Sequence, residues 1–193
     1  KENYGDLIEW RAAQFGGKVV SVDPVKKIVV TEDEEVQADG LNYIPNQKAS
    51  QLAFDSGLVA DGKDWCDIHP KTFESKLVKN VHVIGDASNA APIPKSAFSA
   101  STQGKVVALQ IARMLKQQEP LNPPKLANTC YSLLSPNYGI SIAAVYNALD
   151  DKIQNVDGAG GVSPETDPDG HIRILEAKYA YAWYESQTAD IFK

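Results

Sequence analysis

The stretch Val81-His82-Val83-Ile84-Gly85-Asp86 decides the fold class, because an apolar run that ends in Gly-Asp is typical of a buried strand followed by a tight turn. We expect residues 81–84 to form a short parallel strand that delivers Gly85 to the carboxyl edge of a sheet, where ligands of α/β proteins bind. Gly85 has no side chain, so a cofactor can approach its backbone. The carboxylate of Asp86 can accept hydrogen bonds from hydroxyl groups of that ligand.

A loop rich in Ala, Pro and Asn leads from this turn to a helix predicted over residues 96–116. Its apolar residues recur at helical spacing: Ala97, Ala100, Val107, Ala108, Ile111 and Leu115. The free N–H groups and the positive dipole end of this helix would point back at the ligand. A lone Gly-Asp is more often an ordinary turn, but the combination of strand, turn, Pro-containing loop and small-residue helix is far more specific.

The remainder of the chain is predicted to contain a small antiparallel meander and a separate C-terminal unit. The expected N-terminal elements are a short helix at residues 5–15, strands at 18–23, 26–31 and 36–44, and a loop with a short helix at 46–57. Residues 58–80 are expected to be irregular, and a linker to contain Pro120, Pro123 and Pro124. Residues 125–193 are predicted to have turns at 137–139 and 157–161, a strand at 172–181 and a closing helix at 183–192.

Composition excludes some classes of protein. The net charge of −6 over 193 residues argues against a nucleic-acid surface, which needs clustered Lys and Arg. The sequence has no run of about 18 apolar residues that would span a membrane. Two cysteines, Cys66 and Cys130, do not make a disulfide framework. No spacing typical of metal ligands occurs among His69, His82 and His171.

Several blocks of residues resemble one group of flavoproteins. The run at 81–88, followed by Pro94-Lys95-Ser96 and Gln103-Gly104-Lys105, resembles the second FAD motif of the two-dinucleotide-binding-domain flavoproteins. Within that superfamily the chain is most similar to the flavoprotein subunit of flavocytochrome c sulfide dehydrogenase, from about residue 36 to the end. The blocks that carry this similarity are Ile44-Pro45-Asn46-Gln47-Lys48-Ala49, Trp65-Cys66, Lys71-Thr72-Phe73-Glu74-Ser75, Asn128-Thr129-Cys130-Tyr131-Ser132, Tyr138-Gly139-Ile140-Ser141 and Tyr179-Ala180-Tyr181-Ala182-Trp183-Tyr184.

The resemblance implies a fold class, α/β with α+β parts, and an arrangement of domains. Residues 1–45 would end an NAD-like domain, residues 46–119 would be the second segment of a Rossmann-like FAD domain, and residues 120–193 would form a small α+β interface domain. Similar proteins oxidise sulfide and pass the electrons through FAD to haem c in a cytochrome subunit. The expected partners are thus that cytochrome and the upstream half of the flavoprotein, and the expected compartment is the periplasm.

The resemblance also implies roles for single residues. Cys130 matches one half of a redox-active disulfide beside the flavin, where hydrosulfide can attack sulfur. The plainer interpretation of Cys130 is a buried free cysteine. A disulfide between Cys66 and Cys130 is conceivable, but the family pairs the matching cysteine with one further upstream, and Cys66 is expected to be structural. The residues expected to bind or line the cofactor site are Gln47, Lys48, Gly85, Asp86, Lys95, Ser96 and Trp183, although Trp183 fits a domain core equally well.

Three other functions stay open from the sequence. The first is a sulfide:quinone reductase, although residues 181–193 have few basic side chains for attachment to a membrane surface. The second is another FAD-dependent disulfide oxidoreductase. The third is a non-catalytic interaction domain that keeps the fold.

The sequence also predicts how the chain behaves alone. It has no GxGxxG, and its one Gly-rich stretch, residues 157–161, is expected to be a loop. We therefore expect a C-terminal segment whose phosphate cradle is supplied by residues upstream. A purified polypeptide of these 193 residues should not bind FAD tightly. Titration with FAD, followed by flavin fluorescence, checks this; a stoichiometric complex would contradict it.

Overall fold

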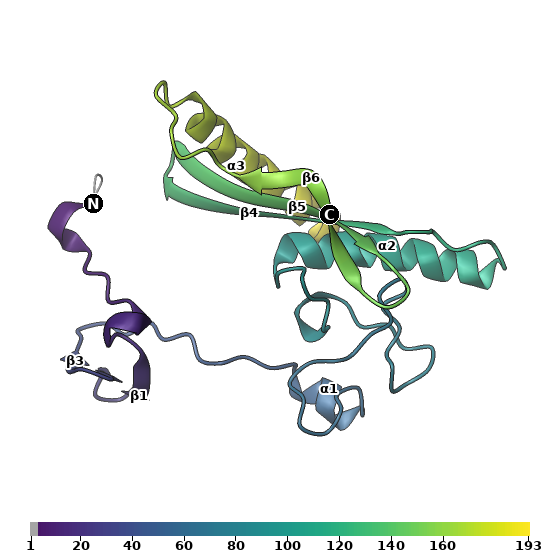
Figure 1. The fold of residues 1–193 in the computed structure, drawn as a ribbon, viewed down its shortest axis with the longest axis horizontal. Coiled ribbons are helices and arrows are strands. Elements are labelled where there is room, and N and C mark those ends of the chain that lie inside the picture. Colours follow the sequence, from purple (N-terminus) through teal and green to yellow (C-terminus); the bar gives the residue numbers. More distant parts are fainter. Residues whose placement is uncertain (1–3) are drawn as a thin grey trace. The chain divides into compact units, whose positions relative to one another are not determined.

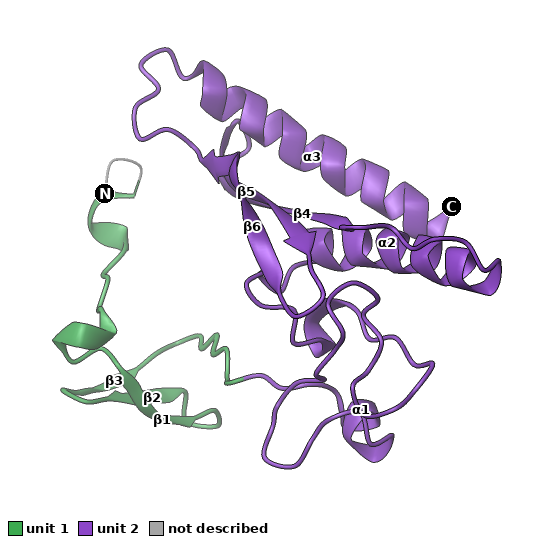
Figure 2. Ribbon diagram, turned by 45° about the vertical axis from the view of Figure 1, so that its right-hand side comes forward, with its two compact units in different colours: residues 1–46 green, residues 47–193 purple. Residues whose placement is uncertain are grey.

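The computed structural model describes residues 4–193 (Figure 1). These residues divide into two compact units, Lys1–Asn46 and Gln47–Lys193, which are coloured separately in Figure 2. The first unit holds a small antiparallel sheet, and the second holds all the residues expected to form the functional site.

The first unit confirms the predicted hairpin and corrects its neighbours. Strands β1 (Val19–Asp23), β2 (Ile28–Thr31) and β3 (Glu35–Gln37) pair antiparallel in that order. The carboxylate of Asp23 closes the first turn by accepting the N–H of Val25 at 3.0 Å and of Lys26 at 2.9 Å. The third strand ends at Gln37 rather than residue 44, because the chain bends at Asp39-Gly40.

The helix predicted at residues 5–15 is wrong. Two 3₁₀ turns, Gly5–Leu7 and Ala13–Phe15, stand there instead. A short helix is marginal in water unless it buries one face. The large apolar side chains of this stretch, Leu7, Trp10 and Phe15, are all exposed, so no such burial stabilises a helix.

The second unit begins with the predicted short helix, α1 (Gln51–Asp55), and continues through irregular chain at 58–80. The strand expected at 81–84 is not formed: among the described residues His82 makes only a single antiparallel bridge with Glu74. A strand needs a neighbouring strand to accept and donate its backbone hydrogen bonds. Here the N–H of Val83 donates to Phe73 O at 2.9 Å, in the irregular segment that precedes it. The sheets of the described residues are antiparallel, so the fold is α+β and a Rossmann-like sheet is not part of them.

The predicted long helix is confirmed as α2 (Ala97–Leu115). Its N-cap is Ser96, whose hydroxyl accepts the N–H of Ser99 at 3.1 Å. At its other end Gln110 is fully buried, and its amide accepts the N–H of Leu121 at 2.8 Å and donates to Lys71 O at 3.1 Å. This side chain therefore satisfies buried backbone groups of the proline-rich segment that follows the helix.

Residues 125–162 form a sheet that the sequence patterns did not reveal. Strands β4 (Lys125–Ser135), β5 (Tyr138–Ala148) and β6 (Ile153–Val162) pair antiparallel in the order β4-β5-β6. The predicted turn at 137–139 is part of the tight connection between β4 and β5, whereas the loop predicted at 157–161 lies inside β6. Gly160 explains that error, because its backbone lies so close to β5 that a Cβ would stand 2.3 Å from Ala143 O. Here the glycine permits close pairing and does not mark a loop.

The strand predicted at 172–181 is also wrong, because residues His171–Phe192 form one helix, α3. The closing helix predicted at 183–192 is its second half. Helix α3 packs on one face of the sheet, mainly on β5, as the ribbon shows (Figure 1). At the closest approach a Cβ on Gly139 would stand 2.6 Å from the backbone nitrogen of Ala177.

One core joins the two parts of the second unit. Side chains of the C-terminal sheet pack in the same cluster as residues from the irregular segment and from α2; the cluster includes Cys66, Ile68, Phe73, Val83, Val107, Leu126, Tyr146, Ala148 and Ile153. Residues 47–119 and 120–193 thus form one compact body. The assignment of residues 1–45, 46–119 and 120–193 to NAD-like, FAD and interface domains stays a prediction.

The close contact between α3 and β5 generates a prediction. Gly139→Ala should lower the free energy of unfolding by about 1–3 kcal/mol, because its Cβ would overlap helix backbone that cannot move as a side chain does. Gly161→Ala on β6 is the matched control, since its Cβ would have nothing within 4 Å, and its effect should stay within about 0.5 kcal/mol. Urea unfolding followed by circular dichroism measures both. Equal effects of the two substitutions would contradict the contact.

Candidate functional site

The Gly85-Asp86 turn is a short 3₁₀ turn, Gly85–Ala87, held against helix α2. Gly85 has φ +65°, a left-handed conformation that favours glycine, and a Cβ there would stand 3.2 Å from the Cβ of Ala100. Its N–H donates to Oε1 of the buried Gln103 at 2.7 Å. The turn therefore has a fixed position relative to the beginning of α2, although no strand delivers it there.

Lys95 braces the turn from its other side. Its ammonium donates to the backbone carbonyls of Asp86 and Ser88 and lies 3.7 Å from the centre of the Trp65 ring. Burial lowers the pKa of Lys95, and the nearby carboxylate of Asp86 acts in the opposite direction. The side chain of Asp86 is exposed, so it stays available to a ligand.

The N-terminus of α2 is suited to an electron-rich ligand edge. The helix has 19 residues and no acidic side chain in its first turn. Its dipole end is therefore not neutralised locally, and N–H groups of the first turn that have no intrahelical partner remain beside the Ser96 cap. The sequence predicted both this helix end and the position of Ser96.

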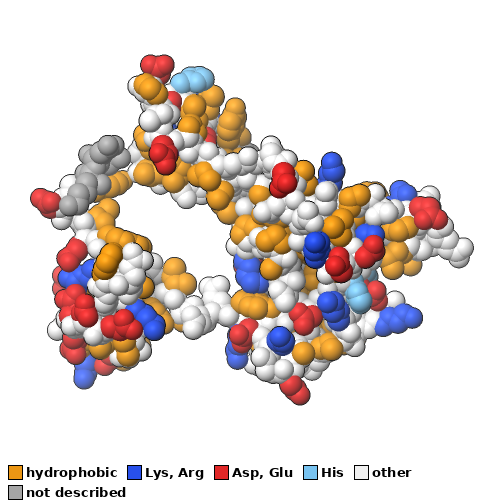
Figure 3. Space-filling model, viewed as in Figure 1, with side chains coloured by type: hydrophobic (Ala, Val, Ile, Leu, Met, Phe, Trp, Pro, Cys, Tyr) orange, Lys and Arg blue, Asp and Glu red, His pale blue; other side chains and the backbone are white. Residues whose placement is uncertain are grey.

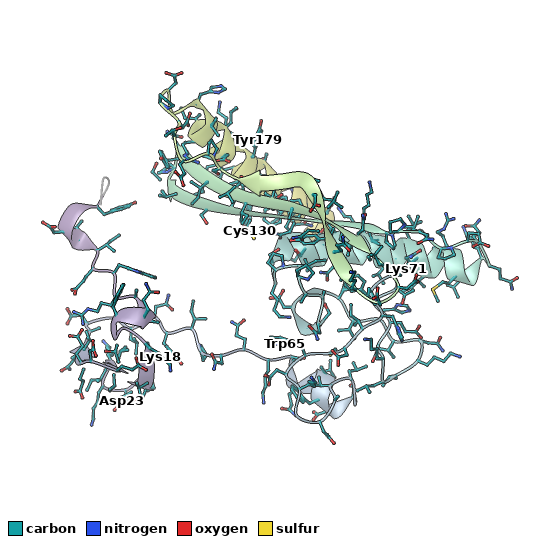
Figure 4. The ribbon with its side chains drawn as sticks, in the orientation of Figure 1. Lys18, Asp23, Trp65, Lys71, Cys130 and Tyr179 are labelled. Carbon is teal, nitrogen blue, oxygen red and sulfur yellow. The ribbon has the colours of Figure 1, made fainter. Side chains whose placement is uncertain are left out.

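Cys130 lies on β4, opposite Ile142 of β5, and beside the beginning of α2 (Figure 4). It is half-buried and borders a groove of about 420 Å³ on the sheet, which also includes Ser132, Ile142, Val162 and Arg173. The buried amide of Asn128 approaches it, with Nδ2 3.4 Å from Sγ. The sulfur is thus reachable from the groove and has a polar neighbour on its inner side.

The sheet face around this groove carries exposed apolar side chains. Leu134, Ile140, Ile142 and Val162 are between 36 and 71% exposed. They alternate with residues that face α3, so they share the face that also carries Cys130. Figure 3 shows hydrophobic side chains at the surface of the region that contains this sheet.

Trp183 links α3 to the same region. Its ring stacks on Phe98 of the first turn of α2, with centroids 5.6 Å apart, and Tyr131 of β4 lies 6.5 Å away. Burial raises the pKa of Tyr131, with Glu176 and Tyr179 adding to the shift. The aromatic cluster therefore borders the N-terminus of α2 and packs α3 against it; a flavin-lining role for Trp183 stays a prediction.

The structure brings together most, but not all, of the predicted residues. Gly85, Asp86, Lys95 and Ser96 surround the beginning of α2, and Asn128 and Phe98 connect it to Cys130 and Trp183. Gln47 and Lys48 are exposed at the start of the unit, where Lys48 Nζ lies 5.0 Å over the ring of Phe54. Their placement beside a flavin stays a prediction.

The two cysteines do not pair with each other. Cys66 is fully buried and Cys130 is half-buried, and both are free thiols. Burial raises the pKa of the Cys66 thiol, Asp67 raises it further, and Lys95 partly offsets this. Cys66 is therefore a core residue, as its expected structural role requires.

Sequence reasoning missed the polar residues that support this region. Gln103 positions the Gly85 turn, and Asn128 and Ser99 connect α2 with β4. Gln103 and Asn128 both lie within sequence motifs that resemble the family. Their positions in those motifs do not indicate that their side-chain amides are buried. Among residues 4–193 no cluster of His, Cys, Asp or Glu could hold a metal ion. Across the same residues, none of the helices has the length and apolar character needed to cross a bilayer.

Fold and site together fit a flavin-binding segment. The features that fit are a turn without a side chain at Gly85, an uncompensated helix N-terminus at Ser96, and a half-buried sulfur at Cys130. Residues 122–192 match the family model described as the flavin-binding domain of flavocytochrome c sulphide dehydrogenase. The match agrees with the family and the FAD cofactor expected from the sequence, and it contains Asn128, Cys130 and Trp183.

The different burial of the two thiols generates a prediction. In the native protein iodoacetamide should label Cys130 and should label Cys66 roughly a hundredfold more slowly, because Cys66 is fully buried and burial raises its pKa. In urea both should react. Peptide mass spectrometry of timed samples measures the two rates, and comparable native rates would contradict the site described here.

Proposed function

We propose that this chain forms one wall of the FAD site of a flavoprotein that oxidises sulfide and passes the electrons to a c-type cytochrome subunit. The observation that carries the proposal is Cys130: within the stretch matched to a flavin-binding domain, its sulfur borders an open groove and contacts Asn128, which is bonded to the first turn of α2. The name of the matched family supports the substrate and the cytochrome partner. A periplasmic location is part of the proposal, because disulfides persist there.

The flavin would meet three groups of this chain. The Gly85 turn would approach the ribityl chain, with Asp86 accepting hydrogen bonds from its hydroxyls. The N-terminus of α2 would face the pyrimidine edge of the ring, where negative charge develops on reduction. The aromatic pair Phe98 and Trp183 borders the same helix end and would exclude water from it. The bound flavin would supply the two-electron acceptor.

Cys130 would act as one sulfur of a redox disulfide, whose other half is a cysteine upstream of this chain. Hydrosulfide attacks the partner sulfur, a new S–S bond forms, and the old S–S bond breaks with its electron pair left on Cys130 as a thiolate. The Cys130 thiolate would then bond to the outer sulfur of the persulfide on the partner cysteine, and formation of this S–S bond releases one proton and two electrons. A bound FAD would supply the acceptor for those two electrons, and the cytochrome subunit would receive them from it. The groove beside Cys130 gives sulfide a way to reach the bond.

The competing functions differ in their electron acceptor. A quinone reductase would use a membrane surface, and α3 does carry exposed apolar side chains, Tyr179, Tyr184 and Phe192. Within α3 the Arg and Lys side chains are Arg173 and Lys178, with Lys193 following as the C-cap, and Arg173 is buried. A cytochrome partner therefore fits this face better than an anionic membrane.

The test uses the flavin-loaded flavoprotein in which this chain is joined to the upstream half expected from the sequence, because the 193 residues alone are not expected to bind FAD tightly. Sulfide should bleach the flavin absorbance, and Cys130→Ser should slow this bleaching by roughly a hundredfold or more, because the substituted side chain cannot form a disulfide. Flavin content should stay unchanged. Cys66→Ser is the matched control and should bleach at a near-normal rate, since Cys66 lies in the core. Stopped-flow absorbance, with cytochrome c or a quinone as the final acceptor, measures the rates.

Two results would contradict the proposal. If sulfide bleached the flavin of Cys130→Ser at the normal rate, the sulfur of Cys130 would have no part in the reaction. Reoxidation of the flavin by quinone but not by cytochrome c would replace the cytochrome partner with the quinone alternative.

A further inference from the structure

Asn128 has an unusual set of hydrogen bonds for a strand residue. It precedes Cys130 by two positions, so both side chains lie on the same face of β4. Its side chain is buried, at 3% exposure. Its Oδ1 accepts from the hydroxyl of Ser96 at 2.6 Å and from the hydroxyl of Ser99 at 2.9 Å.

These two hydroxyls determine which way the amide points. The oxygen of Ser96 accepts the N–H of Ser99, and its hydroxyl proton has two acceptors within reach, Oδ1 of Asn128 at 2.6 Å and Oγ of Ser99 at 3.1 Å, of which the amide oxygen is the closer. Ser99 donates its own hydroxyl proton to the same atom. With Oδ1 occupied by two donors, the amide N–H group is turned toward Cys130, where Nδ2 lies 3.4 Å from Sγ. The N-cap of α2 therefore orients a donor toward the sulfur.

We propose that Asn128 is a positioning residue that holds an N–H donor on the sulfur of Cys130 and stabilises its thiolate. The inference rests on the proposed redox role of Cys130 and names the residue that supports the leaving sulfur. A thiol can donate to Oδ1 of Asn128 only over 3.8 Å, whereas the thiolate accepts from Nδ2 at 3.4 Å. The amide thus favours the charged form, and because it is itself uncharged it does so at every pH.

Other groups near Cys130 have different effects. Burial raises the pKa of Tyr146 of β5, with the nearby Cys130 adding to the shift, so the phenol stays neutral. Glu165 and Arg173 border the same groove, and Arg173 pairs with Glu176 at 3.3 Å. A substitution at Asn128 leaves all of these in place.

The experiment measures alkylation of Cys130 as a function of pH, on this chain and without flavin. Asn128→Asp keeps both acceptor contacts with the serines but replaces the N–H donor by a carboxylate oxygen. It should slow alkylation at pH 7 by about tenfold or more, and the pH at half-maximal rate should rise by about one unit or more. At high pH the two rates should converge, because the thiolate then forms in both proteins.

The matched control is Thr102→Val. Thr102 donates to Ala127 O at 2.9 Å, so it belongs to the same α2–β4 contact without touching the sulfur. It should leave the pH profile of Cys130 within about twofold of the native rate, whatever it costs in stability. Ser99→Ala removes one of the two hydroxyls that orient the amide and should slow alkylation about threefold, which keeps the test decisive if Asn128→Asp does not fold.

The outcomes separate this inference from the proposed function. Asn128→Asp also brings a negative charge beside the sulfur, so the decision rests on Ser99→Ala, which adds no charge. An unmoved pH profile in folded Ser99→Ala, or an equal shift in Thr102→Val, would show that Asn128 only joins α2 to β4 and would overturn the inference. If sulfide fails to bleach the flavin while Ser99→Ala shifts the profile and Thr102→Val does not, the proposed function fails and the support of the thiolate by Asn128 stands.

Discussion

The hydrogen bonds between the first turn of α2 and strand β4 are the interaction on which the rest of the site depends. Ser96 caps the helix and also donates to Asn128, so one hydroxyl fixes both the helix end and the neighbouring strand. Thr102 repeats the connection one turn later by donating to Ala127 O. Each bond contributes about 0.5–1.5 kcal/mol in net terms, but an unpaired buried partner costs more, so these bonds select one relative position of helix and strand. That position places Cys130 beside the helix N-terminus.

Local sequence patterns correctly predicted the elements that are stabilised by interactions between residues close in the sequence. Helix α2 followed from its apolar periodicity, and the first hairpin followed from two β-branched runs joined by Asp23-Pro24. Local patterns gave the wrong secondary structure where contacts with distant parts of the chain determine it. The alternation at 172–181 suggested a strand, yet small side chains such as Ala177 and Ala180 let that stretch pack as a helix on β5. Residues 81–84 look like a strand, but the described residues provide no neighbouring strand to complete a ladder.

The candidate residues could be named from the sequence, whereas the side chains that support them could not. The turn at Gly85 and the helix start near Ser96 followed from local patterns, and Cys130 was named from the resemblance of its flanking residues; their roles toward a flavin stay predictions. Gln103 and Asn128 could not be named as supports, because a buried amide is recognised only by the partners that fold around it. Those partners come from segments up to 32 residues apart, and no local spacing encodes them.

The close contact of α3 with the backbone of β5 at Gly139 means that substitutions on the inner and outer sides of the helix have different costs. The inner side of the helix, with Ala177 and Ala180, is buried against the sheet, so larger side chains there would have to displace their neighbours. The outer side carries Tyr179 and Tyr184, which are 54 and 65% exposed, so replacement there costs less packing. Substitutions on the outward surface of α3 can therefore change what that surface contacts, while Cys130, the Phe98–Trp183 stack and the Ser96 cap keep the same framework.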